Sequence, residues 1–246
     1  MQRYFIDRPI ADNGVVTISG EDAKHISRVM RLGTGDRIIV VMDRKAFEAG
    51  IVEVADQAVY VKPDGDELKN NEMPIHIAIA CGLPKGEKLE WISQKGTELG
   101  MMELLPFKAE RSIVKWDDKK GSKKQERLQK IAKEAAEQSH RSVIPQIHAP
   151  VNLADLLTMS KNYDLLFIAD EEDAKSDNRT RFAEQIKNVY DKLSMMVVFG
   201  PEGGLSRSEV EAFKNAGFKP ISLGPRILRT ETAPLYILSA LSYEIE

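Results

Sequence analysis

Short apolar runs separated by turn residues fill residues 1–63. Apolar and polar positions alternate within the runs, and turn signals such as Asn13-Gly14 and Gly35-Asp36 lie between them, which favours strands. One stretch with helical spacing, Ala23–Leu32, interrupts the pattern. The expected strands are Arg3–Ile6, Val15–Ser19, Asp36–Met42, Phe47–Val54 and Ala58–Lys62. The pattern predicts a small, mostly β domain.

A polar stretch without periodicity, residues 64–72, follows these strands and is typical of a linker. We therefore expect two domains, one over residues 1–68 and the other over residues 74–246.

From residue 74 onward, short apolar runs alternate with segments of helical spacing. The expected strands are Ile75–Cys81, Leu104–Phe107, Leu165–Ala169, Met195–Phe199 and Ile221–Leu223. The expected helices are Lys88–Leu99, Gly121–His140, Arg179–Leu193, Ser206–Ala216 and Pro234–Glu244. Ser206 with Glu209 three residues later forms a capping-box pattern. Alternation of this kind predicts an α/β domain with a parallel sheet covered on both faces.

Two glycine-rich segments, Gly200–Gly204 and Leu223–Ala233, each follow an apolar run and precede a helix. Open α/β sheets bind ligands at this end of their strands. Neither segment carries a P-loop or a dinucleotide fingerprint. Taken alone, the first segment is equally compatible with a tight turn. The second places two arginines, a glutamate and two threonines among apolar residues, which favours a site for a part-polar, part-apolar ligand.

The composition of the chain restricts the classes of protein to which it can belong. The chain has 246 residues, is 42% hydrophobic and 30% charged, and contains no apolar run near the ~20 residues that span a bilayer. Its one cysteine, Cys81, lies in an apolar run and is interpreted as a buried hydrophobe. The absence of a disulfide, of a signal peptide and of metal-ligand spacing predicts a cytoplasmic protein without a metal site.

The net charge of −3 does not indicate a nucleic-acid binder, but the charge is unevenly distributed. Residues 108–133 hold ten basic and four acidic groups, so this window is +6 and the rest of the chain is −9. A local basic face is sufficient for phosphate binding. The window is equally compatible with a helix whose lysines are simply solvated.

Both glycine-rich segments closely resemble those of the RsmE family, a branch of the knotted SPOUT class of RNA methyltransferases. The second segment, Leu223-Gly-Pro-Arg-Ile-Leu-Arg-Thr-Glu-Thr-Ala233, is the more specific of the two. The resemblance covers nearly the whole chain, with supporting stretches Arg3–Phe5, His25–Leu32, Lys95–Gly100, Glu110–Ser112 and Glu137–Ser142. One position departs from the family, because His140 stands where these proteins often have glycine.

The resemblance implies a trefoil-knotted SPOUT methyltransferase domain preceded by a β-rich, PUA-like RNA-binding domain. It implies S-adenosylmethionine as cofactor, N3 of a uridine in 16S ribosomal RNA within the small subunit as acceptor, a homodimer and no membrane partner. The glycines would let the backbone approach the cofactor, and aliphatic residues would wall the adenine. The expected cofactor-binding residues are Gly200, Glu202, Gly203, Leu223, Gly224, Ile227, Leu228, Thr230 and Ala233. The alternative for Ile227 and Leu228 is that they are core residues.

Methylation of uridine N3 requires loss of its proton, so a base or a stabilising cation is needed. Arg229 and Arg226 are candidates for stabilising the uracil anion or for binding a phosphate, with Arg229 as the expected catalytic arginine, and Glu231 is a candidate base. Glu202 is a second candidate base, and either glutamate has an alternative role as a helix cap or ion-pair partner. The expected RNA-binding residues are Arg3, Arg8, Lys24, Arg28, Arg31, Arg111, Arg141 and Arg226. A solvated charged face is the alternative for the basic residues of the N-terminal domain.

Two other functions stay open at this point. One is a related RNA methyltransferase acting on transfer RNA or on a ribose 2′-hydroxyl, and the other is a non-catalytic ribosome-assembly factor. The apolar residues of the closing helix are open to two interpretations, a dimer interface or an ordinary core. They are Leu235, Ile237, Leu238, Leu241 and Ile245.

Overall fold

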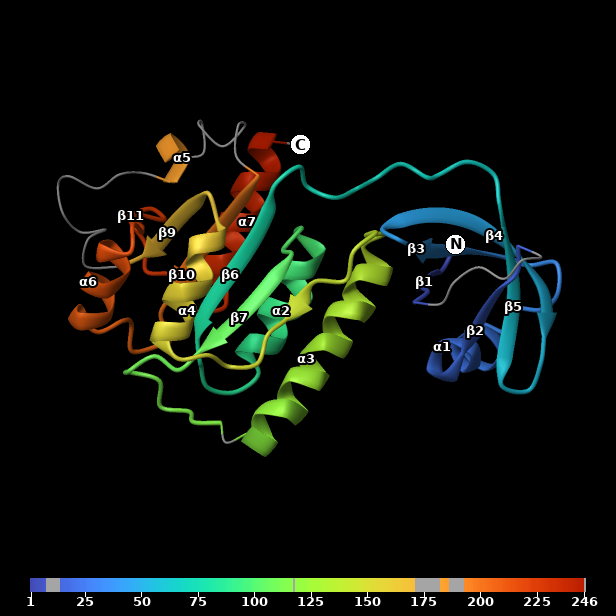
Figure 1. Cartoon of the computed structure of the whole chain (residues 1–246), viewed down its shortest axis with the longest axis horizontal. Coiled ribbons are helices and arrows are strands. Elements are labelled where there is room, and N and C mark those ends of the chain that lie inside the picture. The colour runs from blue at the N-terminus through green and yellow to red at the C-terminus, as the bar shows by residue number, and fades with distance from the viewer. Residues whose placement is uncertain (8–13, 117, 171–181, 186–192, 246) are drawn as a thin grey trace. The chain divides into compact units, whose positions relative to one another are not determined.

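The computed structural model describes residues 1–7, 14–116, 118–170, 182–185 and 193–245 (Figure 1). Its backbone contacts divide the chain into two compact units. The first comprises Met1–Glu72 with Ala136–Val143, and the second comprises Met73–Ala135 with Ile144–Glu246. The functional division at residues 1–68 and 74–246 stays a prediction.

The first unit contains a five-stranded sheet in the order β1-β3-β4-β5-β2. Its strands are β1 (Arg3–Phe5), β2 (Val16–Ser19), β3 (Arg37–Met42), β4 (Lys45–Val54) and β5 (Ala58–Asp64). The β1–β3 pair is parallel, whereas the other three pairs are antiparallel. All five strands expected from the apolar pattern are present. Their alternate side chains, with Ile26, form one buried cluster that includes Tyr4, Ile38 and Val40.

The helical stretch expected at Ala23–Leu32 begins earlier and changes character part-way along. It consists of α1 (Gly20–Lys24) followed by the π-helical turn η1 (His25–Val29). The N–H of Met30 donates to the carbonyl of His25 at 2.9 Å, five residues back. Arg31 then adopts a left-handed φ of 56°, which ends the helix. The sequence pattern therefore located this element but did not reveal its π geometry.

The second unit contains a six-stranded, all-parallel sheet in the order β11-β9-β10-β6-β7-β8. Its strands are β6 (His76–Gly82), β7 (Glu103–Phe107), β8 (Gln146–Ile147), β9 (Leu165–Ala169), β10 (Ser194–Phe199) and β11 (Lys219–Ile221). The α/β class with a parallel sheet is thereby confirmed. β10 lies between β9 and β6 in the middle of the sheet, so its carboxyl end is central (Figure 1).

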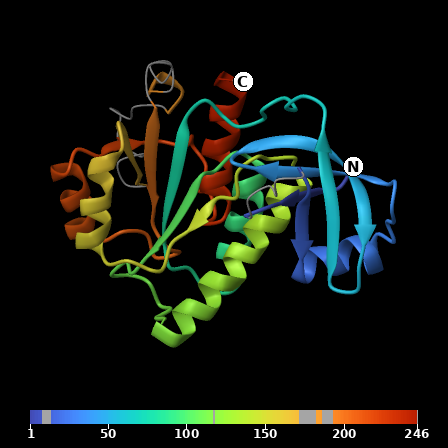
Figure 2. The same ribbon diagram turned by 45° about the vertical axis from the view of Figure 1, so that its right-hand side comes forward.

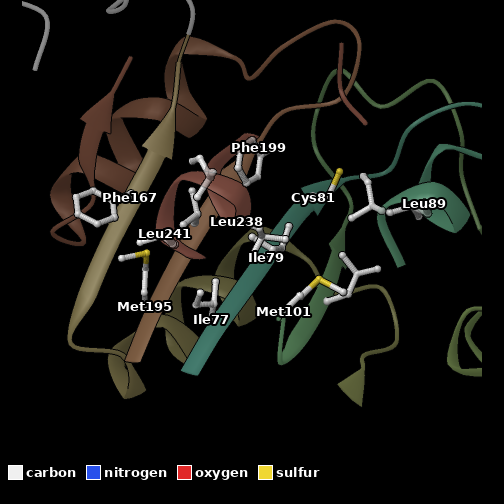
Figure 3. Close-up of a cluster of buried hydrophobic side chains, with 14 of the residues drawn as sticks. Ile77, Ile79, Cys81, Leu89, Met101, Phe167, Met195, Phe199, Leu238 and Leu241 are labelled. Carbon is white, nitrogen blue, oxygen red and sulfur yellow. The ribbon is translucent and has the colours of Figure 1, made fainter. Parts of the chain in front are cut away.

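Helices pack against both faces of this sheet, which explains the continuous apolar runs in its strands. The helices are α2 (Lys88–Glu98), α3 (Asp118–Gln138), α4 (Leu153–Met159), α5 (Phe182–Gln185), α6 (Arg207–Asn215) and α7 (Thr232–Ile245). A short turn, η2 (Ser160–Asn162), follows α4. One buried cluster joins the sheet to α2, α3, α5 and α7, and Figure 3 labels ten of its residues. The other cluster joins the opposite face to α4 and α6.

Three expectations about this unit have different outcomes. β11 ends at Ile221, two residues before the expected end, because its partner β9 ends at Ala169, the residue paired with Ile221. Of the helix expected at Arg179–Leu193, the described residues contain α5 alone, and the remainder lies outside them. Ile237, Leu238 and Leu241 of α7 are fully buried in the core, so the core interpretation holds for these three.

Cys81 lies in the centre of the sheet with no exposed surface. Burial raises the pKa of its thiol to about 12, the charge of Glu202 adds to this effect and that of Lys88 opposes it. A thiol of this kind stays protonated at neutral pH and is a poor nucleophile. The interpretation of Cys81 as a small buried hydrophobe is confirmed.

The histidine that stands where the family often has glycine lies at the end of α3. His140 adopts a left-handed φ of 59°, a conformation that favours glycine. The adjacent N–H of Arg141 donates to the carbonyl of Ala136 at 2.9 Å and so closes the end of the helix. The position therefore ends the helix, and histidine fills it at some conformational cost.

Four polar side chains form a hydrogen-bonded cluster in the second unit, whose parallel strands lie side by side in Figure 2. Glu103 accepts hydrogen bonds from Nε2 of His76 at 2.6 Å, Nε2 of His148 at 2.5 Å and the Tyr163 hydroxyl at 2.8 Å. Burial would raise the pKa of Glu103, but these three bonds together lower it well below its usual range. Burial and the bond to Glu103 raise the pKa of Tyr163. The cluster lies at the opposite edge from the glycine-rich segments.

Within the described residues, every helix is too short or too polar to pass through a bilayer.

Candidate functional site

A cavity of about 820 Å³ lies at the carboxyl edge of the parallel sheet. β9, β10 and β11 end beside it at Ala169, Phe199 and Ile221, and these three residues contribute to its wall. Both glycine-rich segments border the cavity. All nine residues expected to bind the cofactor line it, and Arg111, Arg226 and Arg229 line it too. Glu231 is not among its lining residues.

Close backbone packing fixes the first glycine-rich segment at the end of β10. A Cβ atom on Gly200 would lie 2.9 Å from the carbonyl carbon of Gly204 and 3.0 Å from the N of Leu205. At the neighbouring strand end, a Cβ on Gly82 would lie 2.5 Å from Cδ of Pro201. Real Cβ atoms essentially never come closer than 3.0 Å to another heavy atom, so a side chain at either position would require its neighbours to move. The segment therefore turns tightly on itself because both positions lack side chains.

Glu209 of α6 fixes the end of the same segment by hydrogen bonds. This side chain is 4% exposed and accepts hydrogen bonds from the N–H of Ser206 and from the N–H of Glu110, each at 2.8 Å. The Ser206 hydroxyl accepts from the N–H of Glu209 at 3.3 Å, which completes the capping box expected from the sequence. The buried glutamate therefore ties the segment after β7 to the segment after β10.

Arg111 adds a second connection between these segments. Its Nη1 donates to the carbonyl of Gly203 at 3.2 Å, and a Cβ on Gly203 would lie 3.2 Å from Cβ of Arg111. Gly203 was expected to give the backbone access to the cofactor. In the structure, the lack of a Cβ there also makes room for Arg111.

Lys88, the first residue of α2, lies between the carboxylates of the two glycine-rich segments. Its Nζ is 2.8 Å from Oε1 of Glu202 and 3.7 Å from Oε2 of Glu231. Partial burial would raise the pKa of Glu202, but hydrogen bonds from Lys88 and from the N–H of Lys85 lower it overall. The hydrogen bond to Glu202 raises the pKa of Lys88. Glu202 is thus a fixed carboxylate whose proton affinity is reduced, which disfavours it as a base.

An ion pair forms another part of the cavity wall. Asp170 follows β9 and is 7% exposed, and its two carboxylate oxygens accept from Nη2 of Arg207 at 2.9 and 3.0 Å. Arg207 is the first residue of α6. The pair therefore connects the end of β9 to the helix that follows the first glycine-rich segment.

The second glycine-rich segment presents apolar side chains to the cavity. Ile227 is 73% exposed and borders the cavity, so it is not a core residue. Leu228 is half-buried, and Leu223 and Ala233 lie between the cavity and the core cluster. The segment ends where the carbonyl of Arg229 accepts from the N–H groups of Thr232 and Ala233 at the start of α7. Apolar walls beside polar backbone suit a ligand with a flat, part-polar ring.

Two of the expected RNA-binding arginines are buried in the first unit, which corrects their assignment. Arg3 is 3% exposed, and its Nη1 donates to the carbonyls of His140 and Arg141 at 2.7 and 2.8 Å. Arg141 is also 3% exposed, and its Nε donates to Glu72 at 3.0 Å. Their guanidinium groups hold the 136–143 segment in the first unit and are not available to an RNA phosphate.

Four other residues of the first unit were expected to bind RNA, namely Arg8, Lys24, Arg28 and Arg31. Arg8 lies outside the described residues. Lys24, Arg28 and Arg31 are exposed on α1 and the turn that follows, beside the exposed apolar residues Val29 and Met30. A surface that combines exposed cations with apolar groups can contact both phosphates and bases.

Sequence reasoning missed Gly82, Lys88, Asp170 and Arg207. Gly82 ends an apolar run, as Gly200 does, and that shared position was the available signal. Asp170 likewise follows an apolar run directly, where parallel sheets place their functional residues. Lys88 and Arg207 carried no signal, because a basic residue at the start of an amphipathic helix is ordinarily a solvated side chain.

Comparison with known proteins places both units. Residues 71–242 match the RNA methyltransferase domain family, and residues 18–64 match the RNA methyltransferase PUA domain family. The chain is 45% identical over 251 aligned positions to the ribosomal RNA small subunit methyltransferase E of Bacillus subtilis, covering 100% of this chain and 98% of the relative.

Two solved structures resemble it along their whole length. One is a crystal structure of a hypothetical protein, with a TM-score of 0.91 and 43% identity over 100% of this chain and 99% of the other. The other is a Legionella pneumophila methyltransferase in complex with the bound cofactor SAM, with a TM-score of 0.84 and 31% identity over 98% and 97% of the two chains.

The cavity formed by the two glycine-rich segments, the PUA domain and the full-length similarity agree with one another, and the chain belongs to the family of ribosomal RNA small subunit methyltransferase E.

Proposed function

We propose that this protein transfers the methyl group of S-adenosylmethionine to N3 of a uridine in 16S ribosomal RNA. The observation that carries the proposal is the cavity of about 820 Å³ between the two glycine-rich segments at the carboxyl edge of the sheet. The names of the relatives support a small-subunit ribosomal RNA substrate, and the solved Legionella structure supports the cofactor.

The residues around the cavity fit this cofactor. When bound, S-adenosylmethionine supplies an electrophilic methyl group on a sulfonium. Leu223, Ile227 and Leu228 would bind the adenine with their apolar surfaces, and the backbone of the second glycine-rich segment would contact its polar edge. The tight turn at Gly200 leaves the first segment's backbone exposed toward the cavity. A volume of this size lies within the range of small-molecule sites.

The acceptor needs help from the protein, because uridine N3 becomes a good nucleophile only after it loses its proton. Arg229 lines the cavity and is exposed, so its guanidinium can stabilise the negative charge that develops on the uracil. Glu231 follows two residues later. Its carboxylate lies 3.7 Å from Lys88, and it is the proposed proton acceptor, since Glu202 is held by shorter hydrogen bonds. Arg111 and Arg226 border the cavity and would contact RNA phosphates.

The modified atom is the direct test of the proposal. Purified protein with 30S subunits lacking their native methyl groups should incorporate one methyl group, which mass spectrometry of the digested RNA should identify as 3-methyluridine. Transfer to a ribose 2′-hydroxyl or to transfer RNA would contradict the assigned acceptor. Cofactor binding without transfer to any RNA would indicate a non-catalytic assembly factor. Comparison of naked 16S RNA with assembled subunits in the same assay tests the subunit context.

We also propose that the second domain is trefoil-knotted and that the protein forms a homodimer with C₂ symmetry. Trp91 of α2 and Tyr236 and Tyr243 of α7 are 55%, 45% and 92% exposed, and large exposed aromatic side chains are enriched at interfaces. Light scattering should give about twice the chain mass of 27.6 kDa. A measured mass of one chain at micromolar concentration would contradict the dimer.

A further inference from the structure

Two carboxylates from different glycine-rich segments approach one ammonium group at the cavity. Lys88 Nζ lies 2.8 Å from Oε1 of Glu202 in the first segment and 3.7 Å from Oε2 of Glu231 in the second. The three side chains are 28%, 31% and 23% exposed, so water screens them only in part. Between the same two carboxylates, a neutral residue in place of Lys88 would leave like charges facing each other.

The two contacts differ in kind. Glu202 also accepts from the backbone N–H of Lys85 at 3.0 Å, so two donors from one short stretch of chain fix its Oε1. Glu231 Oε2 is buried and accepts no hydrogen bond in the described part of the chain. The ammonium of Lys88 lies 3.7 Å away and offsets its charge, and a buried carboxylate oxygen without a nearby cation is costly.

Lys88 itself is attached to a rigid element. It is the first residue of α2, whose Leu89 and Ile92 are buried in the core of the sheet. The backbone of Lys88 is therefore fixed, and the contacts with Glu202 and Glu231 locate its ammonium group.

We infer that Lys88 is a positioning residue that holds the two segments of the cavity together by pairing with one carboxylate from each. The inference rests on the proposed function, because it explains how the cavity keeps the shape that the cofactor needs. Lys88 lines the cavity but acts through Glu202 and Glu231, so we assign it no chemical step.

Binding of S-adenosylhomocysteine, measured by calorimetry, tests the inference with four variants. Lys88→Met should weaken binding about tenfold, the size expected from losing a charged hydrogen bond. Lys88→Arg should restore most of the affinity, because it keeps the positive charge. Adding Glu231→Gln to Lys88→Met should recover part of the loss, because it removes the repulsion between the two carboxylates. The control is Lys95→Met, which removes an i,i+3 pair with Glu98 from the same helix, and it should bind as the wild type does.

Thermal unfolding of each variant separates a local effect on the cavity from a loss of fold. Two results would overturn the inference while leaving the cofactor assignment intact. One is wild-type affinity in Lys88→Met, and the other is a loss of affinity in Lys88→Arg and Lys95→Met that equals the loss in Lys88→Met. A wild-type protein that binds no S-adenosylhomocysteine would instead overturn the proposed function, and the inference with it.

Discussion

Replacing Gly200 by alanine is expected to weaken the binding of S-adenosylmethionine at least about 100-fold. The added Cβ would lie 2.9 Å from the carbonyl carbon of Gly204, 3.0 Å from its Cα and 3.0 Å from the N of Leu205. All three are backbone atoms, so no side-chain rotation can relieve the clash. The first glycine-rich segment must open, and the surface that it contributes to the cavity is lost. We expect the dissociation constant to rise at least about 100-fold, since cavity shape and preorganisation are lost together.

The matched control is Gly121→Ala in the same unit. A Cβ at Gly121 would find Cδ of Pro150 at 3.9 Å, an ordinary contact, and this glycine lies inside α3 where alanine favours the helix. Gly82→Ala should behave like Gly200→Ala, because its Cβ would lie 2.5 Å from Pro201. Calorimetry with the cofactor and circular dichroism of each variant decide the matter. Tight binding by Gly200→Ala would show that this turn does not form the cofactor surface.

The strands and glycine-rich segments were predictable because each depends on local pattern. A strand buried on both faces is a continuous apolar run, and β6, β9 and β10 each read that way. Ser206 and Glu209 predicted the start of α6, because a capping box requires only two residues three positions apart. β8 has two residues, Gln146 and Ile147, and a pair of residues has no period to recognise.

The contacts between distant segments were not predictable. Lys88 and Glu202 are 114 residues apart in the sequence, and Glu209 reaches the N–H of Glu110 across 99 residues. Arg3 and Arg141 were wrongly predicted to bind RNA, because a basic residue in an RNA-binding domain suggests an exposed contact. Each instead satisfies carbonyl or carboxylate groups inside the first unit, at 3% exposure. No local pattern distinguishes a guanidinium that holds its own domain together from one that binds a phosphate.

α4 lies between these cases. Asn152 accepts from the N–H of Asp155 at 2.9 Å and so caps the helix, and an asparagine three residues before an aspartate is a usable start signal. The helix has seven residues and one fully buried side chain, Leu156, so its apolar periodicity is weak. The sequence analysis predicted no helix here, because the capping signal alone does not determine the length and packing of the helix, which depend on the rest of the fold.

We propose that the first domain, which matches a PUA domain, binds RNA, and that the second domain binds the cofactor and transfers the methyl group. This division predicts a second large effect, on replacement of arginines in either domain. Arg229→Ala should reduce single-turnover methyl transfer at least about 100-fold, the usual cost of removing a group that stabilises developing charge. Its affinity for the cofactor should change little, because the apolar and backbone surfaces of the cavity remain. Its affinity for RNA should fall only modestly, since one of several phosphate or base contacts is lost.

Removal of positive charge from the first domain should weaken RNA binding and leave the affinity for the cofactor unchanged. Arg28 and Arg31 are exposed, and Arg31 has a φ of 56°, so Arg31→Asn suits its backbone better than alanine does. The variant with Arg28→Ala and Arg31→Asn should bind RNA more weakly. The slope of log K against log salt should become shallower by about 1.4 to 1.8 if both residues contact phosphate. Its cofactor affinity should equal that of the wild type.

Arg37→Gln is the control for loss of charge from the same domain. Its guanidinium is already held by Glu48 at 3.0 Å and by Asp64, so it is not free to bind a phosphate, and its removal should alter the salt slope little. Filter binding across a salt series, calorimetry with the cofactor and single-turnover methylation should be measured for all three proteins. Loss of cofactor binding in the Arg28 and Arg31 variant, or wild-type methylation by Arg229→Ala, would contradict the division. The exposed cations beside Val29 and Met30 lie in one unit and the cavity arginine in the other, so the two sets of effects should separate.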